Sequence, residues 1–136
     1  MTGSAYTMNY PRHSLRPLTQ DEKEVLVEMM RRSPFGAEEF VAQIEGCVIE
    51  QLNGDASDFD LHVSSDAPLF HEDRLYGYTP VGARYHDADG SPVDIIVQVG
   101  GGRIRTFQLV KHMPKPLIRG PKADGLYDFV IEPRNA

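Results

Sequence analysis

Two runs of alternating hydrophobic residues, joined by a short turn, constrain the fold of this chain more than any other feature. Every second residue is hydrophobic over residues 81–85 and again over residues 93–99. Alternation of this kind places the hydrophobic side chains on one face of a β-strand. Asp87-Ala-Asp-Gly90 lies between the two runs, and its glycine is free to adopt the positive φ of a hairpin turn. The sequence therefore predicts an antiparallel hairpin with one buried face.

Four further segments have the character of strands. A hydrophobic strand is expected over residues 47–52, and residues 58–63 alternate polar with hydrophobic side chains, so the two are predicted to pair. Three consecutive glycines form a turn before a strand over residues 103–110, whose hydrophobic positions slip by one and indicate a β-bulge. A proline-containing stretch over residues 112–124 precedes a short last strand, Tyr127 to Ile131. The strands together predict a β-sheet that is mainly antiparallel.

Two helices are expected before the strands. Thr19 and Glu22 have the spacing of a capping box, which predicts a helix that begins at Gln20. Ser33-Pro34 ends this helix and can start a second one, because proline suits a first helical turn, and Gly46 ends the second helix. This order predicts an α+β fold, with the two N-terminal helices packed on one face of a five- or six-stranded meander sheet.

The chain has enough residues for one hydrophobic core, since it contains 136. We expect a flexible leader over residues 1–14, a single α+β domain over residues 15–132 and a tail over residues 133–136. The single cysteine, Cys47, excludes an internal disulfide and favours the cytoplasm. No hydrophobic run is long enough to span a membrane.

Charge is distributed unevenly along the chain. The formal net charge is −6, but residues 36–98 contain 13 acidic residues against two basic ones, a net charge of −11. Residues 99–136 contain seven basic residues against three acidic ones, a net charge of +4. The acidic middle favours a surface that attracts a basic protein and repels nucleic acid and anionic membranes. The alternative is a surface on which the two signs interleave once the chain has folded.

The residues expected to contact a partner are acidic side chains with aromatic residues beside them. Such a mixture is common at protein contact surfaces, although half-buried aromatic residues that only anchor a loop would have the same pattern. The expected set is Asp55, Asp58, Asp60, Phe70, Glu72, Asp73, Tyr76 and Tyr78.

No catalytic signature, cofactor motif or metal site is identified from the sequence. His62 follows Asp58 and Asp60 on one face of a strand, and such a row could hold a metal ion. A metal site needs a further ligand and a group that orients the imidazole, and neither can be recognised in the sequence. We therefore interpret the row as a solvated strand face, and we expect no cofactor and no metal.

Two short motifs carry a resemblance to a known family. Arg16-Pro-Leu-Thr19 is followed by Glu22, and Asp87-Ala-Asp-Gly90 is followed by Ser-Pro92. With these motifs the chain resembles a family of small bacterial proteins of unknown function that share an R-P-L-T-x-x-E opening and a D-x-D-G-x-P turn. The resemblance covers roughly residues 15–132 and brings no catalytic residues with it. Proteins of this type are similar to immunity proteins encoded beside bacterial toxins.

The expected function is that of a cytoplasmic protein-binding module, an immunity-like inhibitor that covers a basic toxin through an acidic surface. It would act as a monomer or homodimer and would bind neither nucleic acid nor membrane. One alternative is a small enzyme or ligand-binding domain with a pocket between helices and sheet that uses His62, His86 or Arg84. Another is a self-associating structural protein that pairs through the edge strand Tyr127 to Ile131.

Overall fold

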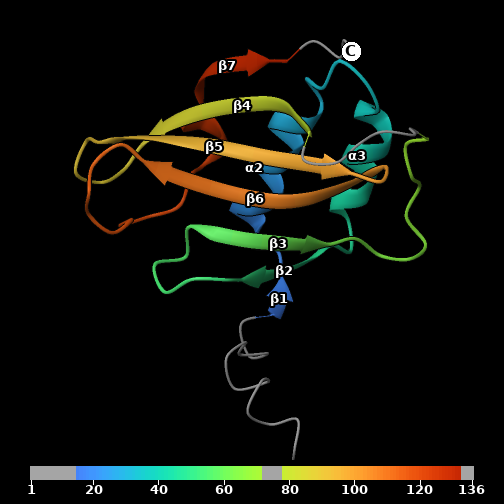
Figure 1. Cartoon of the computed structure of the whole chain (residues 1–136), viewed down its shortest axis with the longest axis horizontal. Coiled ribbons are helices and arrows are strands. Elements are labelled where there is room, and N and C mark those ends of the chain that lie inside the picture. Colours follow the sequence, from blue (N-terminus) through green and yellow to red (C-terminus); the bar gives the residue numbers. More distant parts are fainter. Residues whose placement is uncertain (1–14, 72–77, 133–136) are drawn as a thin grey trace, which may run out of the picture.

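Two helices, α2 (Gln20–Met30) and α3 (Ala37–Ile44), lie on one face of an antiparallel sheet, which gives an α+β fold (Figure 1). The computed structural model describes residues 15–71 and 78–132, so the expected leader and tail lie outside the described residues. Seven strands form the sheet in the order β1-β2-β3-β6-β5-β4-β7. They are β1 (Leu15–Pro17), β2 (Val48–Gln51), β3 (Asp58–His62), β4 (Tyr78–His86), β5 (Pro92–Gly100), β6 (Arg103–Lys111) and β7 (Tyr127–Ile131).

The expectation of five or six strands in a meander was wrong in two respects. β1 is an additional strand that pairs with β2, and its three residues are too few for an alternating pattern to show. The strands also do not follow chain order, because β3 pairs with β6 rather than with β4. After β3 the chain therefore crosses to β4, two strands beyond β6, and then returns through β5 to β6, which lies beside β3.

The start of α2 agrees with the predicted capping box. Thr19 accepts a hydrogen bond from the Glu22 amide, and the Glu22 carboxylate accepts one from the Thr19 amide. The Arg16 guanidinium of β1 forms a bidentate ion pair with the same carboxylate, and both N–O distances are 2.8 Å. Burial raises the pKa of Glu22, but the bonds from Arg16 and Thr19 outweigh this effect and leave the pKa below its usual value. The R-P-L-T-x-x-E motif thus fastens β1 to the first turn of α2.

The second helix begins later than predicted, at Ala37 rather than at Pro34. Gly36, the residue before it, has a left-handed backbone with φ 64°, which a helix interior does not allow. Phe35 is buried and packs edge-on against Phe40, so the segment before Gly36 forms a turn over the core instead of a helical turn.

The core lies between the helices and the covered face of the sheet. The alternating residues of β4 and β5 are buried as predicted, and so is the hydrophobic stripe of α2. The predicted bulge in β6 is also present. Gln98 pairs with Thr106 while Val99 pairs with Ile104, so Arg105 is the extra residue.

A buried glutamine fixes the segment after β3 to the sheet. Gln43 of α3 is fully buried and donates hydrogen bonds to the carbonyl oxygens of Pro68 and Gly102, both at 2.8 Å. Its side-chain oxygen accepts the Ile104 amide at 3.0 Å. Gly102 has φ 78°, and a Cβ at this position would lie 2.2 Å from the Phe70 carbonyl oxygen, so only glycine fits here.

Residues 112–126, which we call the C-terminal strap, run from the end of β6 to β7 and are held by the turn between β4 and β5. The Asp87 carboxylate accepts the amides of Ile118 at 2.9 Å and Arg119 at 3.0 Å. The ammonium of Lys111 lies 2.9 Å from both Asp87 and Asp89. The D-x-D-G-x-P turn therefore anchors a distant segment as well as reversing the chain.

Candidate functional site

The helices cover one face of the sheet and leave the opposite face open (Figure 1). The register places Glu50 of β2 opposite Asp60 of β3, and Asp60 opposite Thr106 of β6. Asp58 lies opposite Gln108, whose amide donates to the Asp58 carboxylate at 3.3 Å. All of these residues share the face that the helices leave open, which we call the open face.

The charge of the open face is concentrated at β2 and β3. These two strands place three carboxylates and the His62 imidazole on it, and neither strand contains a lysine or arginine. Near β4 the carboxylates are paired with a basic side chain, because Arg84 lies 2.7 Å from Asp94 and 3.7 Å from Asp128. Arg103 and Arg105 are exposed beside the β5–β6 turn. The β2–β3 end of the open face is therefore its acidic part.

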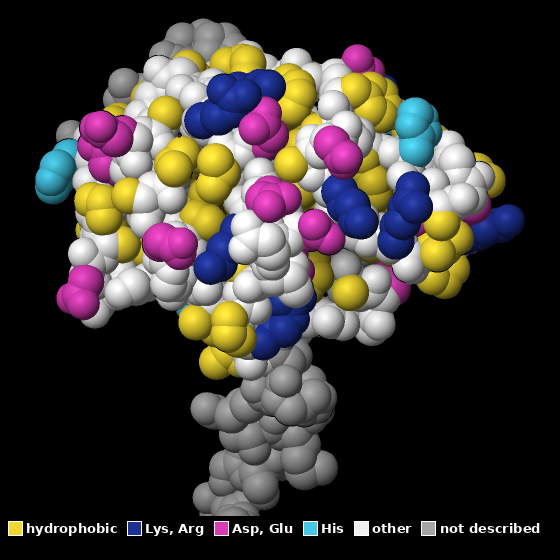
Figure 2. Space-filling view, turned by 180° about the vertical axis from the view of Figure 1, so that it is seen from behind, with side chains coloured by type: hydrophobic (Ala, Val, Ile, Leu, Met, Phe, Trp, Pro, Cys, Tyr) yellow, Lys and Arg dark blue, Asp and Glu magenta, His cyan; other side chains and the backbone are white. Residues whose placement is uncertain are grey.

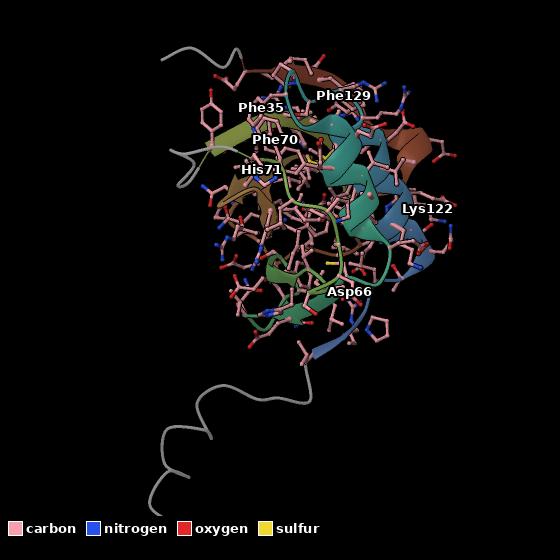
Figure 3. The ribbon with its side chains drawn as sticks, turned by 90° about the vertical axis from the view of Figure 1, so that its right-hand side faces the viewer. Phe35, Asp66, Phe70, His71, Lys122 and Phe129 are labelled. Carbon is pink, nitrogen blue, oxygen red and sulfur yellow. The ribbon has the colours of Figure 1, made fainter. Side chains whose placement is uncertain are left out.

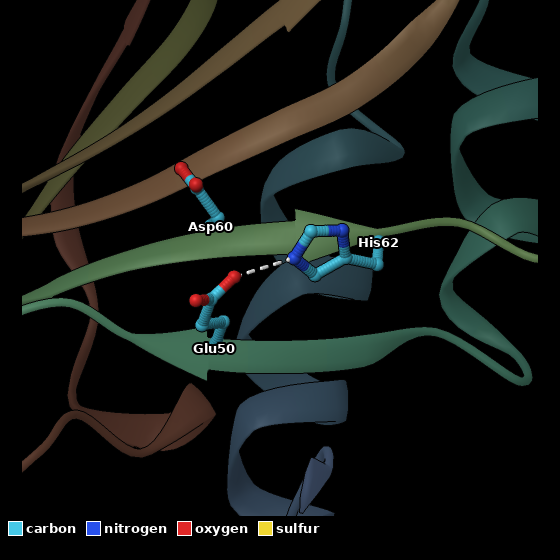
Figure 4. A group of neighbouring side chains, drawn as sticks. All are labelled: Glu50, Asp60 and His62. Carbon is cyan, nitrogen blue, oxygen red and sulfur yellow. Dashed lines mark hydrogen bonds and ion pairs between the residues drawn. The ribbon is translucent and has the colours of Figure 1, made fainter. Parts of the chain in front are cut away.

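Glu50, Asp60 and His62 form a compact group within this acidic part (Figure 4). One donor atom from each residue lies within 4.8 Å of the other two, and His62 Nε2 lies 2.9 Å from Glu50 Oε1. The His62 side chain is 50% exposed and that of Glu50 is 27% exposed, so the group is open to solvent. The sequence analysis found Asp60 and His62 but missed Glu50. A correct register for the predicted pairing of the two strands would have placed Glu50 beside them.

Asp58 and Asp60, two of the predicted contact residues, lie on the acidic part of the open face. Asp55 lies elsewhere, in the loop between β2 and β3. Its carboxylate accepts the Ser57 hydroxyl at 2.6 Å and the Leu117 amide at 3.3 Å. These bonds hold the pKa of Asp55 below its usual value and tie the loop to the C-terminal strap.

The predicted aromatic anchors are part of a cluster at one end of the core (Figure 3). The rings of Phe70 and Tyr78 lie 5.4 Å and 5.2 Å from the ring of Phe35, and Phe70 also lies 5.9 Å from Phe40. Both are half-buried and pack against the core, the arrangement expected of aromatic residues that anchor a loop. Glu72, Asp73 and Tyr76 lie outside the described residues.

The helical side of the molecule carries charges of both signs. Figure 2 shows lysine and arginine side chains interspersed with aspartate and glutamate, without a large area of one sign. Glu28 of α2, for example, lies 2.8 Å from both Arg31 and Arg32. The hydrogen bonds from these arginines lower the pKa of Glu28 to about 2. The acidic part of the open face is thus distinct in charge from the helical side.

A pocket of about 360 Å³ lies between α2, the sheet and the C-terminal strap. Its floor is apolar, with Phe59 and Phe107 from the sheet and Leu117 from the strap, and charged residues form its rim. This is the position at which the sequence analysis placed a pocket. The residues proposed for it do not line it, because His62 and Arg84 lie on the open face and His86 lies at the end of β4.

Cys47 is a buried thiol directly before β2. Burial raises the pKa of this thiol to about 11, although a backbone hydrogen bond from His62 acts in the opposite direction. The thiol is therefore protonated at neutral pH, in keeping with a packing residue rather than a nucleophile.

No protein-family model matches the chain, and no curated protein or solved structure matches it either. Within residues 15–71 and 78–132, neither helix has the length and apolar character that crossing a membrane requires.

Proposed function

We propose that this protein is a protein-binding module that presents the acidic part of its open face to a basic partner. The observation that carries this proposal is the placement of Glu50, Asp58 and Asp60 on two adjacent strands that contain no lysine or arginine. Complementary charge of this kind accelerates encounter with a basic protein and selects against acidic ones.

The rigid backbone of the sheet also suits a contact surface. Its carboxylates stand on hydrogen-bonded strands whose positions the ladder fixes, so little backbone entropy is lost when a partner binds. Exposed apolar side chains lie on the same face, including Val110 of β6, which is 46% exposed and opposite Asp94. Mixed polar and apolar area of this kind is typical of protein interfaces that form and dissociate.

The partner class that we favour is a basic toxin, so that the protein acts as an immunity-like inhibitor. An enzyme that attacks nucleic acid must be basic to hold its substrate, and an acidic protein can occupy the same surface. The resemblance to a family of small bacterial proteins of unknown function, which are similar in type to immunity proteins, is compatible with this role. The same acidity disfavours nucleic acid and anionic membranes as partners, and the module would work in the cytoplasm.

The proposal is tested with matched charge reversals. Asp58→Lys combined with Asp60→Lys acts on the open face, whereas Glu24→Lys combined with Asp124→Lys produces the same change in net charge on the helical side. The partner is a basic protein captured from a lysate by the wild-type chain, and its association is measured by surface plasmon resonance at low and moderate salt. We expect the open-face variant to associate about tenfold more slowly at low salt, or slower still, and the control to remain close to wild type.

Equal association of the two variants would contradict the proposal, and so would a rate that is insensitive to salt. Melting temperatures of both variants are measured in parallel, because a folded variant is required for the comparison. The substituted side chains all lie at the surface or half-exposed, so we expect both variants to fold.

A second candidate function is the binding of a small amphipathic molecule in the pocket between α2, the sheet and the C-terminal strap. The pocket combines an apolar floor with a rim of mixed charge, so it favours a ligand with a hydrophobic body and a polar head. The charged rim residues are Asp21, Glu22, Asp55, Arg16, Arg119 and Lys122. Thermal shift measurements with matched series of medium-chain and aromatic carboxylates and amines test it, and Lys122→Ala, a change at an exposed rim residue, should weaken any stabilisation that the carboxylates cause.

Self-association through β7 has less support from the geometry. β7 pairs only with β4 among the described strands, so its other edge is open. However, Asp128 has a left-handed φ of 52°, and the pairing with β4 is irregular between Gly82 and Arg84. Such irregularity twists an edge strand and protects it from pairing with another copy.

A further inference from the structure

We infer that Glu50, Asp60 and His62 form a binding site for a divalent transition-metal ion such as Zn²⁺, because adjacent strands bring two carboxylates and an imidazole to one point on the open face (Figure 4). The site shares Glu50 and Asp60 with the acidic part of the open face, so a bound ion would reduce the negative charge offered to a basic partner. Zinc binding is measured without the partner, so the two proposals can fail separately. The row expected from the sequence was Asp58, Asp60 and His62, whereas in the structure Glu50 of the neighbouring strand takes the place of Asp58.

The spacing of the donor atoms suits a single ion. Bonds of about 2.0–2.2 Å from nitrogen and oxygen to zinc place neighbouring ligand atoms roughly 3.4 Å apart in a tetrahedral site. The three donor atoms here lie within 4.8 Å of one another, and the pair from Glu50 and His62 is already at 2.9 Å. Small side-chain rotations would bring all three into the range that one ion requires.

The sheet organises the ligands before any ion binds. Glu50 and Asp60 are directly opposite each other in the β2–β3 ladder, and His62 follows Asp60 by two residues on the same face. The backbone positions of the three ligands are therefore fixed by hydrogen-bonded strands rather than by a loop. Binding an ion would therefore order side chains only and not the backbone, and this small entropy cost favours binding at a defined site.

The two carboxylates have an electrostatic reason to take up a cation. Like charges directly opposite each other on antiparallel strands destabilise the pair. Among the described residues, neither Glu50 nor Asp60 forms an ion pair with a lysine or arginine, and His62 offers positive charge only when it is protonated. A bound divalent ion would neutralise both carboxylates and relieve their repulsion.

The donor set indicates which class of ion fits. Magnesium and calcium prefer sites composed of oxygen atoms, whereas an imidazole nitrogen suits zinc, nickel and copper. Three protein ligands leave at least one coordination position for water or for a donor from another molecule. The site therefore resembles open zinc sites in its ligand number rather than closed structural ones.

The test is a calorimetric titration of the full chain with ZnCl₂, comparing wild type with His62→Ala and with a matched control, His112→Ala. His112 is also an exposed histidine 2.9 Å from a carboxylate, that of Asp94, but Arg84 already neutralises this carboxylate. We expect saturable binding to wild type and to His112→Ala, with affinity reduced at least about tenfold in His62→Ala. Asp60→Asn should weaken binding in the same direction.

Amide chemical shifts recorded during the titration locate the ion, and they should change first in β2 and β3. Absence of saturable zinc binding to wild type would overturn the inference. Equal affinity of wild type and His62→Ala would also overturn it, because the zinc would then occupy another site. Circular dichroism checks that each variant is folded, and His62→Gln replaces His62→Ala if the alanine variant is not.

Discussion

The buried pair of Asp87 and Lys111 leads to a sharp prediction about stability. Asp87 is fully buried at its side chain and Lys111 is 5% exposed, and their charged groups are 2.9 Å apart. In Asp87→Asn the lysine would lose its buried counter-ion, and the bonds to Ile118 and Arg119 would weaken. Breaking a buried ion pair costs about 3–5 kcal/mol. Asp89 still faces Lys111, so we expect a loss of about 3 kcal/mol in the free energy of unfolding.

The pH dependence of the same variant has a predictable sign. Burial raises the pKa of Asp87, but the bonds from Lys111 and the backbone amides outweigh it, so the pKa in the folded state lies below its usual value. The ionised Asp87 carboxylate therefore contributes its full stabilisation above about pH 4, because the carboxyl is then ionised in the unfolded chain as well. This contribution is lost as the pH falls through the lower pKa of the folded state. The difference between wild type and Asp87→Asn should be largest at pH 7 and should shrink in acid.

Urea unfolding followed by circular dichroism at a series of pH values measures both quantities. Asp89→Asn is the matched control, because its side chain is 28% exposed and also faces Lys111, and we expect a clearly smaller loss for it than for Asp87→Asn. A change below about 1 kcal/mol for Asp87→Asn, or a difference that stays constant in acid, would refute the role assigned to this pair.

Three further predictions concern residues outside the open face. Gly102→Ala should lower the free energy of unfolding by more than about 2 kcal/mol, because φ is positive and the Phe70 backbone occupies the space that a Cβ would need. Gly54→Ala is the control: its Cβ would meet no atom, so urea unfolding should show a change of less than about 0.5 kcal/mol. Gln43→Leu removes three hydrogen bonds, leaves the buried Ile104 amide without its acceptor, and should cost about 2 kcal/mol, measured in the same way. Cys47 should resist iodoacetamide at pH 7.5 until urea unfolds the chain; rapid labelling of the native protein, followed by mass spectrometry, would contradict its assignment as a buried thiol.

Local signals in the sequence predicted the local features of the fold. Thr19 and Glu22 are three residues apart and form the predicted capping box, since both partners lie within one helical turn. The hairpin between β4 and β5 and the bulge at Arg105 also follow from patterns within a few residues. In contrast, β1 has three residues and forms only because β2 is available for pairing, so no local pattern could reveal it.

The candidate sites depend on contacts between distant residues, which explains why they were only partly predicted. Glu50 lies 12 residues before His62 in the chain, and only the register of the β2–β3 pairing brings the two together. The role of Asp87 depends on a strap that lies 31 residues further along the chain at Ile118. Asp58 and Asp60 were predicted correctly as polar positions, because alternation within one strand decides which face they occupy.

The measurement that tests the proposed function most directly is a map of the contact surface by NMR. The ¹⁵N-labelled protein is titrated with a basic protein captured from a lysate by the wild-type chain, and amide shifts and signal losses are recorded for each residue. The proposed function predicts that they concentrate in β2, β3 and the adjoining residues of β6, around Asp60 and Thr106. Changes confined to α2, α3 or the C-terminal strap would contradict it, because the partner would then bind the opposite side of the sheet.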